Sequence, residues 1–235
     1  SLITNQDNGY LNTNATLVVT ATFDEEMDNG VRIGFTADEN TKVDYPMTAT
    51  SSTVWTYEWT APAEWPDGEF VVAIHSAQDL AGTPYSGNAS ETLVLDTTSP
   101  TIRLEWNKEN AIFRGGETIV YTVILDENIS TPPLFSMSGI VTSTAMTATN
   151  SETHWNYNLL VPSGINSTAL VTVIAEDIAG NTSTYTSSKS FEIDSEVPIL
   201  TAIELSDDNT IIDLTFSDLI FIDTTATSSI SVNDL

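Results

Sequence analysis

The chain has 235 residues, with 33 acidic side chains against 6 basic ones and a formal net charge of −27. Such a field repels phosphate backbones and anionic lipid surfaces, so we expect cations as counter-species and no nucleic-acid partner. The sequence has no cysteine, and no apolar run approaches the ~18 residues of a membrane span. We therefore expect no disulfide, no thiol redox chemistry and no direct membrane insertion.

The first clear element is a strand in which apolar residues alternate with Val and Thr from Leu17 to Phe23. The same alternation returns at 119–125 and at 212–216. A period of two predicts a half-buried antiparallel strand with one face inward. Acids follow each time, as Phe23-Asp24-Glu25, Leu125-Asp126-Glu127 and Phe216-Ser217-Asp218. Because 2–25 aligns without a gap on 104–127, the chain is expected to start inside the first strand of a domain.

The later strands show that the chain repeats with a period near 100. The motif Met-Thr-Ala-Thr occurs at Met47 and Met146, and Trp55-Thr56-Tyr57 returns as Trp155-Asn156-Tyr157. VVAIHSAQDLAG, which begins at Val71, is echoed in ALVTVIAEDIAGN, which begins at Ala169. A unit of this length suits one whole sandwich of about seven strands. The predicted fold is all-β, with tandem immunoglobulin-like β-sandwiches arranged end to end and almost no helix.

Proline-containing linkers mark the boundaries between units. Leu95-Asp96-Thr97-Thr98-Ser99-Pro100 and Ile193-Asp194-Ser195-Glu196-Val197-Pro198 each end one strand and precede another. We expect sandwiches at 1–98 and 99–196 and the opening strands of a third, incomplete one at 197–235. Short, partly stiff linkers predict a rod. The uncovered face of the third unit would be completed either by residues beyond Leu235 or by another chain.

Acidic residues are predicted to gather at the junctions. In a seven-strand sandwich the second and sixth strands run in the same direction, so their ends meet at the pole where the first strand enters. Asp96, Glu127 and Asp177 should therefore converge between the first two sandwiches. Similarly, we expect two further carboxylate pairs, one at the second junction and one at the front of the first sandwich: Asp194 with Asp218, and Glu25 with Asp79.

Clustered carboxylates repel one another unless a cation lies among them. Ca²⁺ accepts six to eight oxygens in loose geometry, whereas Mg²⁺ demands stricter octahedral coordination. Asp126, Asn128 and Asn181 are further candidate oxygen donors. The alternative is that Asp79 and Asp177 only serve the turns before glycine, with the other acids solvated. No EF-hand loop is present, because the start at Asp24 has Phe35 where the motif needs Glu.

Together these motifs resemble the bacterial and archaeal immunoglobulin-like repeats of large cell-surface proteins, including adhesins and surface-layer proteins. The shared pattern is a strand ending in FDE or FSD, then WxY, AxDxAG(N) and FxIDxxxP. This chain departs from it at Gly82-Thr83, where the second copy has Gly180-Asn181. The resemblance implies an extracellular, cell-surface location and structural Ca²⁺ at interdomain junctions.

The expected function is structural rather than enzymatic. His75 and His154 share no spacing, and there is no nucleophile elbow, phosphate loop or zinc motif. We predict a spacer of an adhesin stalk, in contact with neighbouring domains of its own chain. A segment of a surface-layer lattice, in contact with identical subunits, is the alternative. A carbohydrate-binding module with Trp65 as its platform is weaker, because packing in the core is the favoured role for that residue.

Overall fold

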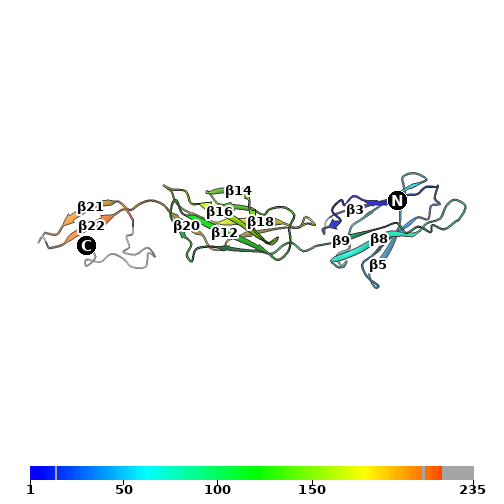
Figure 1. Ribbon diagram of the computed structural model, residues 1–235, viewed down its shortest axis with the longest axis horizontal. Coiled ribbons are helices and arrows are strands. Elements are labelled where there is room, and N and C mark those ends of the chain that lie inside the picture. Colours follow the sequence, from blue (N-terminus) through cyan, green and yellow to red (C-terminus); the bar gives the residue numbers. More distant parts are fainter. Residues whose placement is uncertain (14, 208–209, 219–235) are drawn as a thin grey trace.

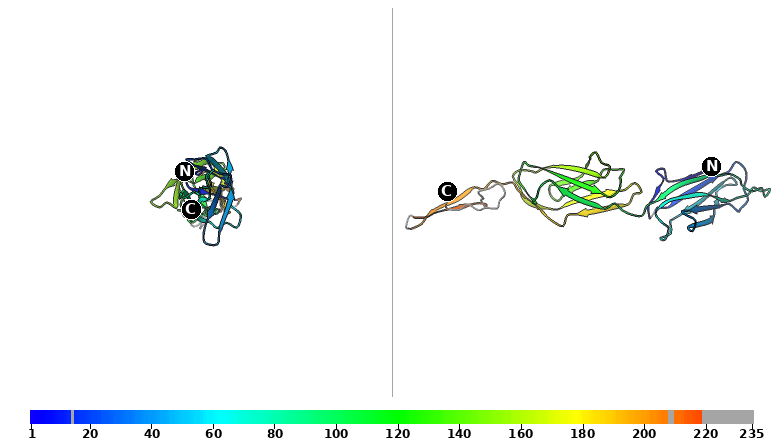
Figure 2. Two further views of the ribbon diagram at one scale, coloured as in Figure 1. Left: turned by 90° about the vertical axis from the view of Figure 1, so that its right-hand side faces the viewer. Right: turned by 60° about the horizontal axis from the view of Figure 1, so that its bottom comes forward.

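The computed structural model describes residues 1–13, 15–207 and 210–218, and within these ranges the regular structure consists of strands. Two β-sandwiches follow one another along the long axis, and a two-stranded ribbon continues the line (Figure 1). The two further views show the same narrow, extended shape (Figure 2). No helix long and apolar enough to cross a membrane occurs in the described residues. The all-β expectation is confirmed.

The first sandwich consists of a four-stranded and a five-stranded sheet. The first sheet has the order β1 (Leu2–Thr4), β3 (Leu17–Thr22), β7 (Val54–Trp59) and β6 (Thr48–Ala49). The second has the order β2 (Tyr10–Leu11), β9 (Ser90–Leu95), β8 (Gly68–Ser76), β4 (Arg32–Thr36) and β5 (Lys42–Pro46).

The second sandwich repeats this plan with more strands. One sheet has the order β10 (Ile102–Trp106), β12 (Thr118–Leu125), β16 (His154–Leu160) and β15 (Thr147–Ala148). The facing strands have the order β14 (Val141–Ala145), β13 (Leu134–Met137), β18 (Val171–Glu176) and β19 (Thr182–Thr186). Three more form a small sheet in the order β11 (Ile112–Phe113), β20 (Phe191–Asp194) and β17 (Asn166–Ala169).

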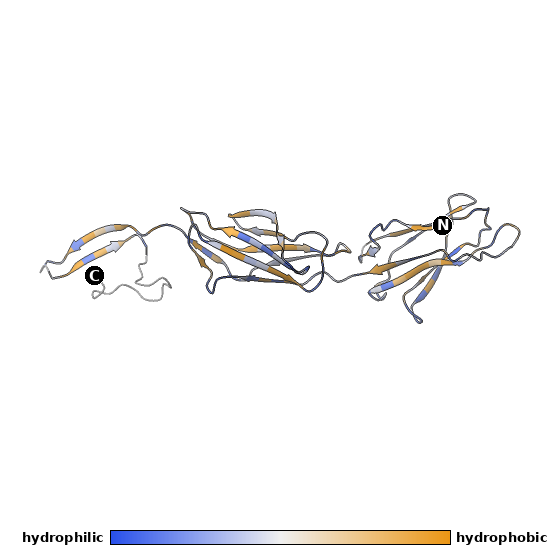
Figure 3. Cartoon of the chain, viewed as in Figure 1, coloured by the Kyte–Doolittle hydropathy of each residue, from blue (hydrophilic) through white to orange (hydrophobic). Residues whose placement is uncertain are grey.

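The predicted alternation on the second strand of each sandwich is confirmed. Leu17, Val19 and Ala21 are buried on β3, and Ile119, Tyr121 and Val123 are buried on β12. Each sandwich has its own core: one cluster of buried side chains extends from Leu2 to Leu95, and the other from Leu104 to Ile193. Hydrophobic segments alternate with polar ones along many of the strands (Figure 3). The boundaries at 98/99 and 196/197 stay predictions.

Tryptophans fill the first core rather than its surface. Trp55 and Trp155 are buried at matched positions, as their recurrence indicates. Trp65, on the loop before β8, is only 6% exposed and lies edge-on to Trp59, with ring centroids 5.2 Å apart. The favoured core role of Trp65 is therefore confirmed and its interpretation as an exposed sugar platform is wrong. Burial of a large ring in a packed core outweighs its place in a loop.

A ribbon of β21 (Leu200–Leu205) and β22 (Ile212–Phe216) begins the third unit. The strands pair antiparallel, with Ile203 opposite Leu214 and Leu205 opposite Ile212. The apolar side chains of this ribbon are largely exposed: Ile203 is 65% exposed and Ile212 is 62% exposed. The remainder of the expected third unit, 219–235, lies outside the described residues.

Candidate metal centre

Three carboxylates from distant parts of the sequence meet between the first two sandwiches. Asp96, Glu127 and Asp177 each offer an oxygen, and these oxygens all lie within 4.8 Å of one another. Asp96 directly follows β9, Asp177 directly follows β18, and Glu127 lies two residues after β12. β12 and β18 both end at this pole of the second sandwich. Glu127 and Asp177 therefore lie close together although they are far apart in the sequence. The structure thus brings together the three residues that topology predicts.

Asp177 is held rigidly by the turn that it begins. Its side chain is nearly buried, at 2% exposure, and its Oδ1 accepts the backbone N–H of Asn181 at 2.8 Å. The Asn181 amide donates to the other carboxylate oxygen, also at 2.8 Å. Gly180 adopts a φ of 91°, which a residue with a Cβ rarely tolerates. The turn role considered as the alternative is therefore real, and it fixes Asp177 in the cluster at the same time.

Asn181 also ties the turn to the linker, since its Nδ2 donates to the Asp96 carbonyl at 2.8 Å. From the first sandwich, the Asn8 amide donates to the Ile178 carbonyl at 3.1 Å. The sequence motifs alone do not single out Asn8. The repeat does mark this position, because Asn8 recurs as Asn110. Each side chain accepts the backbone N–H of the second residue after it. That repetition indicates a conserved loop shape within this chain, though not an interdomain contact.

The cluster is electrostatically strained. Partial burial, together with the negative charges of Asp177, Asp96 and Asp126, raises the pKa of Glu127 to about 7. Near neutral pH a proton or a cation is therefore favoured at this carboxylate. The donors are all oxygens, which suits a hard cation such as Ca²⁺. If calcium binds, these three side chains would hold it, and its charge would offset their mutual repulsion.

The other predicted ligands lie outside this group. One Asp126 oxygen accepts the backbone N–H of Thr101 at 2.7 Å, and this bond lowers the pKa of Asp126. Asn128 donates its amide to Glu152 at 2.8 Å. Among the described residues, Asp96, Glu127 and Asp177 are the only three His, Cys, Asp or Glu side chains that approach one another this closely. The metal roles of Asp126 and Asn128 stay predictions.

The remaining candidate ligands lie at the second junction and at the front of the first sandwich. One buried oxygen of Asp194 has no hydrogen-bond partner in the described part of the chain. Asp218 is exposed and lies two residues after β22. At the front of the first sandwich, Asp79 begins a turn like that of Asp177 and accepts the Thr83 N–H at 2.7 Å. Glu25 lies two residues before Met27, which pairs with Asp79 in an isolated bridge. Neither predicted pair belongs to a group of three.

A pH titration in chelator tests the cluster without metal. Because the folded pKa of Glu127 lies above its unfolded value, protonation stabilises the native state, and this contribution is present below about pH 4.5. It is lost as the pH rises through about 7. We expect the Tm of the second sandwich to fall over this window. Glu127→Gln should remove that part of the fall, measured by calorimetry. An equal fall in both proteins would contradict the assignment.

Comparison with known proteins supports the fold. Residues 53–194, more than half of the chain and reaching into both sandwiches, match the family of bacterial Ig-like domains, group 3. A search of curated proteins found no match.

Among solved structures, one from a 1.5-MDa bacterial ice-binding adhesin is 18% identical with a TM-score of 0.48, covering 83% of this chain and 64% of that one. A Ca²⁺-stabilised adhesin of an Antarctic bacterium is 16% identical with a TM-score of 0.49, covering 89% and 53%. A tetra-tandem repeat from the extending region of a large adhesion protein is 16% identical with a TM-score of 0.38, covering 90% and 56%. This chain thus spans 53–64% of the length of those structures. By its match over 53–194, the chain belongs to the family of bacterial Ig-like domains, group 3.

Proposed function

We propose that this chain is a spacer segment of a long extracellular cell-surface protein, a rod of the adhesin-stalk type stiffened by Ca²⁺ at its first domain junction. The observation that carries the proposal is the position of the carboxylate cluster. Asp96 follows the last strand of the first sandwich, whereas Glu127 and Asp177 belong to the second. A cation held by all three would connect the two sandwiches across the linker.

The contacts of the linker support the same function. On the side of the first sandwich, the Thr97 hydroxyl donates to Asp67 at 2.8 Å, and the Thr98 hydroxyl donates to the same carboxylate at 3.2 Å. On the side of the second, Ser183 donates its hydroxyl to the carbonyl of Pro100, which is itself buried. A linker bonded at both ends bends little. The cation would then restrict the rotation that remains.

The chemistry of the cluster assigns distinct tasks to its members. Asp177, fixed by its turn, supplies a carboxylate that needs no reordering to bind a cation. Glu127 must lose its proton before it can coordinate, so calcium affinity is expected to rise with pH through about 7. Asp96 is the group that transmits binding to the linker. No catalytic group is needed for this role.

Calcium titration of the full chain tests the proposal. Extracellular Ca²⁺ modules bind at about 0.1–1 mM, so a titration to roughly 10 mM covers the range. We expect small-angle scattering to show a narrower spread of interdomain angles in calcium than in chelator. Mg²⁺ is the matched ion control and should act weakly, because it requires octahedral geometry.

An unchanged spread of angles over this calcium range would contradict the stiffening role. Self-assembly of the purified protein into sheets with calcium would favour the surface-layer lattice instead. The two outcomes are distinguishable in the same samples, because sheet formation is visible by electron microscopy.

A further inference from the structure

A groove of about 480 Å³ lies along β15, the edge strand of its sheet in the second sandwich. Small-molecule sites have volumes of roughly 300–1,000 Å³, so this groove is large enough for one. Apart from two alanines, the residues that line it carry amide or hydroxyl groups: Thr147, Thr149, Asn150, Asn156, Tyr157 and Asn158. We call it the amide groove. Its lining has no charged side chain, although the chain has a net charge of −27.

The sequence around the groove is also nearly free of charge. Between 128 and 175, Glu152 is the only Asp, Glu, Lys or Arg. The corresponding stretch of the first sandwich, 26–77, carries acids and bases along its length, including Arg32, Asp44 and Glu58. A cation would gain more from the acidic parts of the chain, and an anion is repelled by their field. The amide groove therefore suits an uncharged ligand.

The amides of the groove have hydrogen-bonding groups to spare. Asn156 Oδ1 accepts the Thr122 hydroxyl at 2.9 Å, which orients the side chain and leaves its NH₂ group to donate elsewhere. Asn150 and Asn158 are exposed, and their side chains have no hydrogen-bond partner within the part of the chain that the structure describes. Each amide has two donors and an acceptor. Several neighbouring hydroxyl groups, which both donate and accept, match such a lining.

An aromatic ring completes the groove. Tyr157 is half-buried and stacks on Phe135, with centroids 4.4 Å apart, so one face of the Tyr157 ring is covered. In the first sandwich the corresponding ring, Tyr57, is also stacked by Tyr45 of β5, at 5.1 Å. Thr144 of β14 lies two residues before the Met-Thr-Ala-Thr motif, as Tyr45 does, but it is exposed and has no ring. The uncovered part of Tyr157 thus offers an apolar surface beside the amides.

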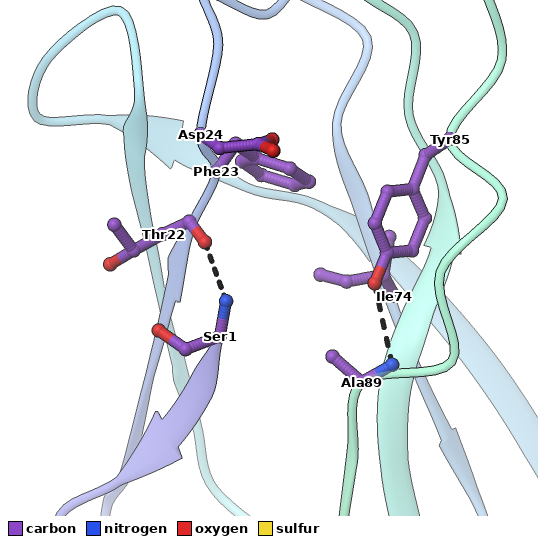
Figure 4. A pocket seen from close by; sticks show the side chains of 7 residues that line it. All are labelled: Ser1, Thr22, Phe23, Asp24, Ile74, Tyr85 and Ala89. Carbon is purple, nitrogen blue, oxygen red and sulfur yellow. Dashed lines mark hydrogen bonds between the residues drawn. The ribbon is translucent and has the colours of Figure 1, made fainter.

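The pocket at the front of the first sandwich differs in both respects (Figure 4). There the rings of Phe23 and Tyr85 pack edge to face, with centroids 5.6 Å apart, so each ring already contacts the other. Asp24 adds a carboxylate to the lining. A ligand selected for neutrality and for contact with an uncovered ring is therefore expected in the second sandwich alone.

We propose that the amide groove binds a neutral saccharide unit of a glycan. The amides of Asn150, Asn156 and Asn158 bond the hydroxyl groups of the sugar. The apolar C–H face of the sugar lies against the part of Tyr157 that Phe135 does not cover. No carboxylate takes part, so binding does not depend on a metal at the first junction. This role adds lateral attachment to the spacer function.

An array of immobilised oligosaccharides tests the proposal with the full chain, joined into tetramers so that weak binding is detected. The array carries neutral gluco-, galacto- and manno-oligosaccharides beside sialylated ones. We expect binding to a neutral series, equally in calcium and in chelator, and none to the sialylated members. Absence of binding to every neutral series would overturn the proposal. So would binding that chelator abolishes, because the site would then require the metal, or binding of uncharged peptides in place of saccharides.

Asn158→Asp tests whether the bound saccharide lies in the amide groove. The substitution keeps the size of the side chain but replaces the amide donor with a charge, and Asn158 is exposed, so the fold should be unaffected. Loss of its hydrogen bonds should raise the Kd for the saccharide selected on the array about tenfold, measured by calorimetric titration. Asn88→Asp makes the same change at an exposed residue of the first sandwich and should leave the Kd unchanged. An unchanged Kd for Asn158→Asp, or an equal loss in both variants, would overturn the assignment.

Discussion

Replacing Trp59 with alanine is expected to unfold the first sandwich at a much lower temperature while the second melts as before. Trp59 is 2% exposed, and its ring stacks on Phe35 with centroids 4.6 Å apart. It also contacts the rings of Trp65 and Phe70 at 5.2 and 5.3 Å. Truncation of such a residue costs ~3–5 kcal/mol, which lowers the Tm of a domain of this size by about 12 °C or more.

Leu159→Ala is the matched control, because Leu159 occupies the corresponding place on β16 and is 3% exposed. Its loss of ~2–5 kcal/mol should lower the second transition and leave the first unchanged. Differential scanning calorimetry resolves the two events. The two cores share no residue, which is why we expect independent unfolding. A single transition that shifts as a unit in both variants would contradict the proposed division into domains.

Trp59→Phe refines the interpretation. The indole nitrogen of Trp59 is buried without a hydrogen-bond partner in the described structure. Phenylalanine keeps most of the ring contacts and removes this unsatisfied donor, so we expect a much smaller loss of stability than for alanine. A loss as large as that of alanine would show that the full ring volume, rather than the apolar contact alone, specifies this core.

The long strands of the fold could be predicted from sequence because their pattern has a physical cause. On β3 and β12 every second side chain enters a core, so the alternation survives even where the residues differ. The short edge strands leave no such trace. β2 and β11 have two residues each, yet they pair in parallel with β9 and β20. Two residues carry no periodicity, so tertiary packing alone decides their partners.

The candidate site was predictable to the extent that strand direction determines it. Asp96, Glu127 and Asp177 follow strand ends at a common pole, and that argument needs no side-chain detail. Asp126 shows where prediction from strand direction stops. Neighbouring residues near a strand end point to different sides, so Asp126 binds Thr101 while Glu127 joins the cluster. The contact of Asn8 with Ile178 depends on how the two sandwiches pack, which no local pattern encodes.

Exchanging Asp177 for asparagine is expected to abolish most of the stabilisation by calcium. At a free calcium concentration one hundred times its Kd, binding stabilises the folded state by ~2.7 kcal/mol. For a sandwich of about 100 residues that corresponds to a Tm increase of about 11–22 °C. Asp177→Asn removes one of three carboxylates, so the increase should nearly vanish. In chelator the variant should melt somewhat below the parent. The amide oxygen can still accept the Asn181 backbone N–H, but the NH₂ group cannot accept the Asn181 side-chain amide, and the weaker repulsion on Glu127 offsets only part of this loss.

Asp79→Asn is the control that separates metal binding from turn formation. Asp79 begins the same kind of turn in the first sandwich and accepts the Thr83 N–H at 2.7 Å, but it does not belong to the carboxylate cluster. Its exchange should therefore leave the calcium response intact. If Asp177→Asn and the parent gain the same Tm with calcium, the cluster does not hold the ion. If both variants lose the response, turn geometry rather than coordination governs it, and the stiffening role would have to be assigned to the linker contacts alone.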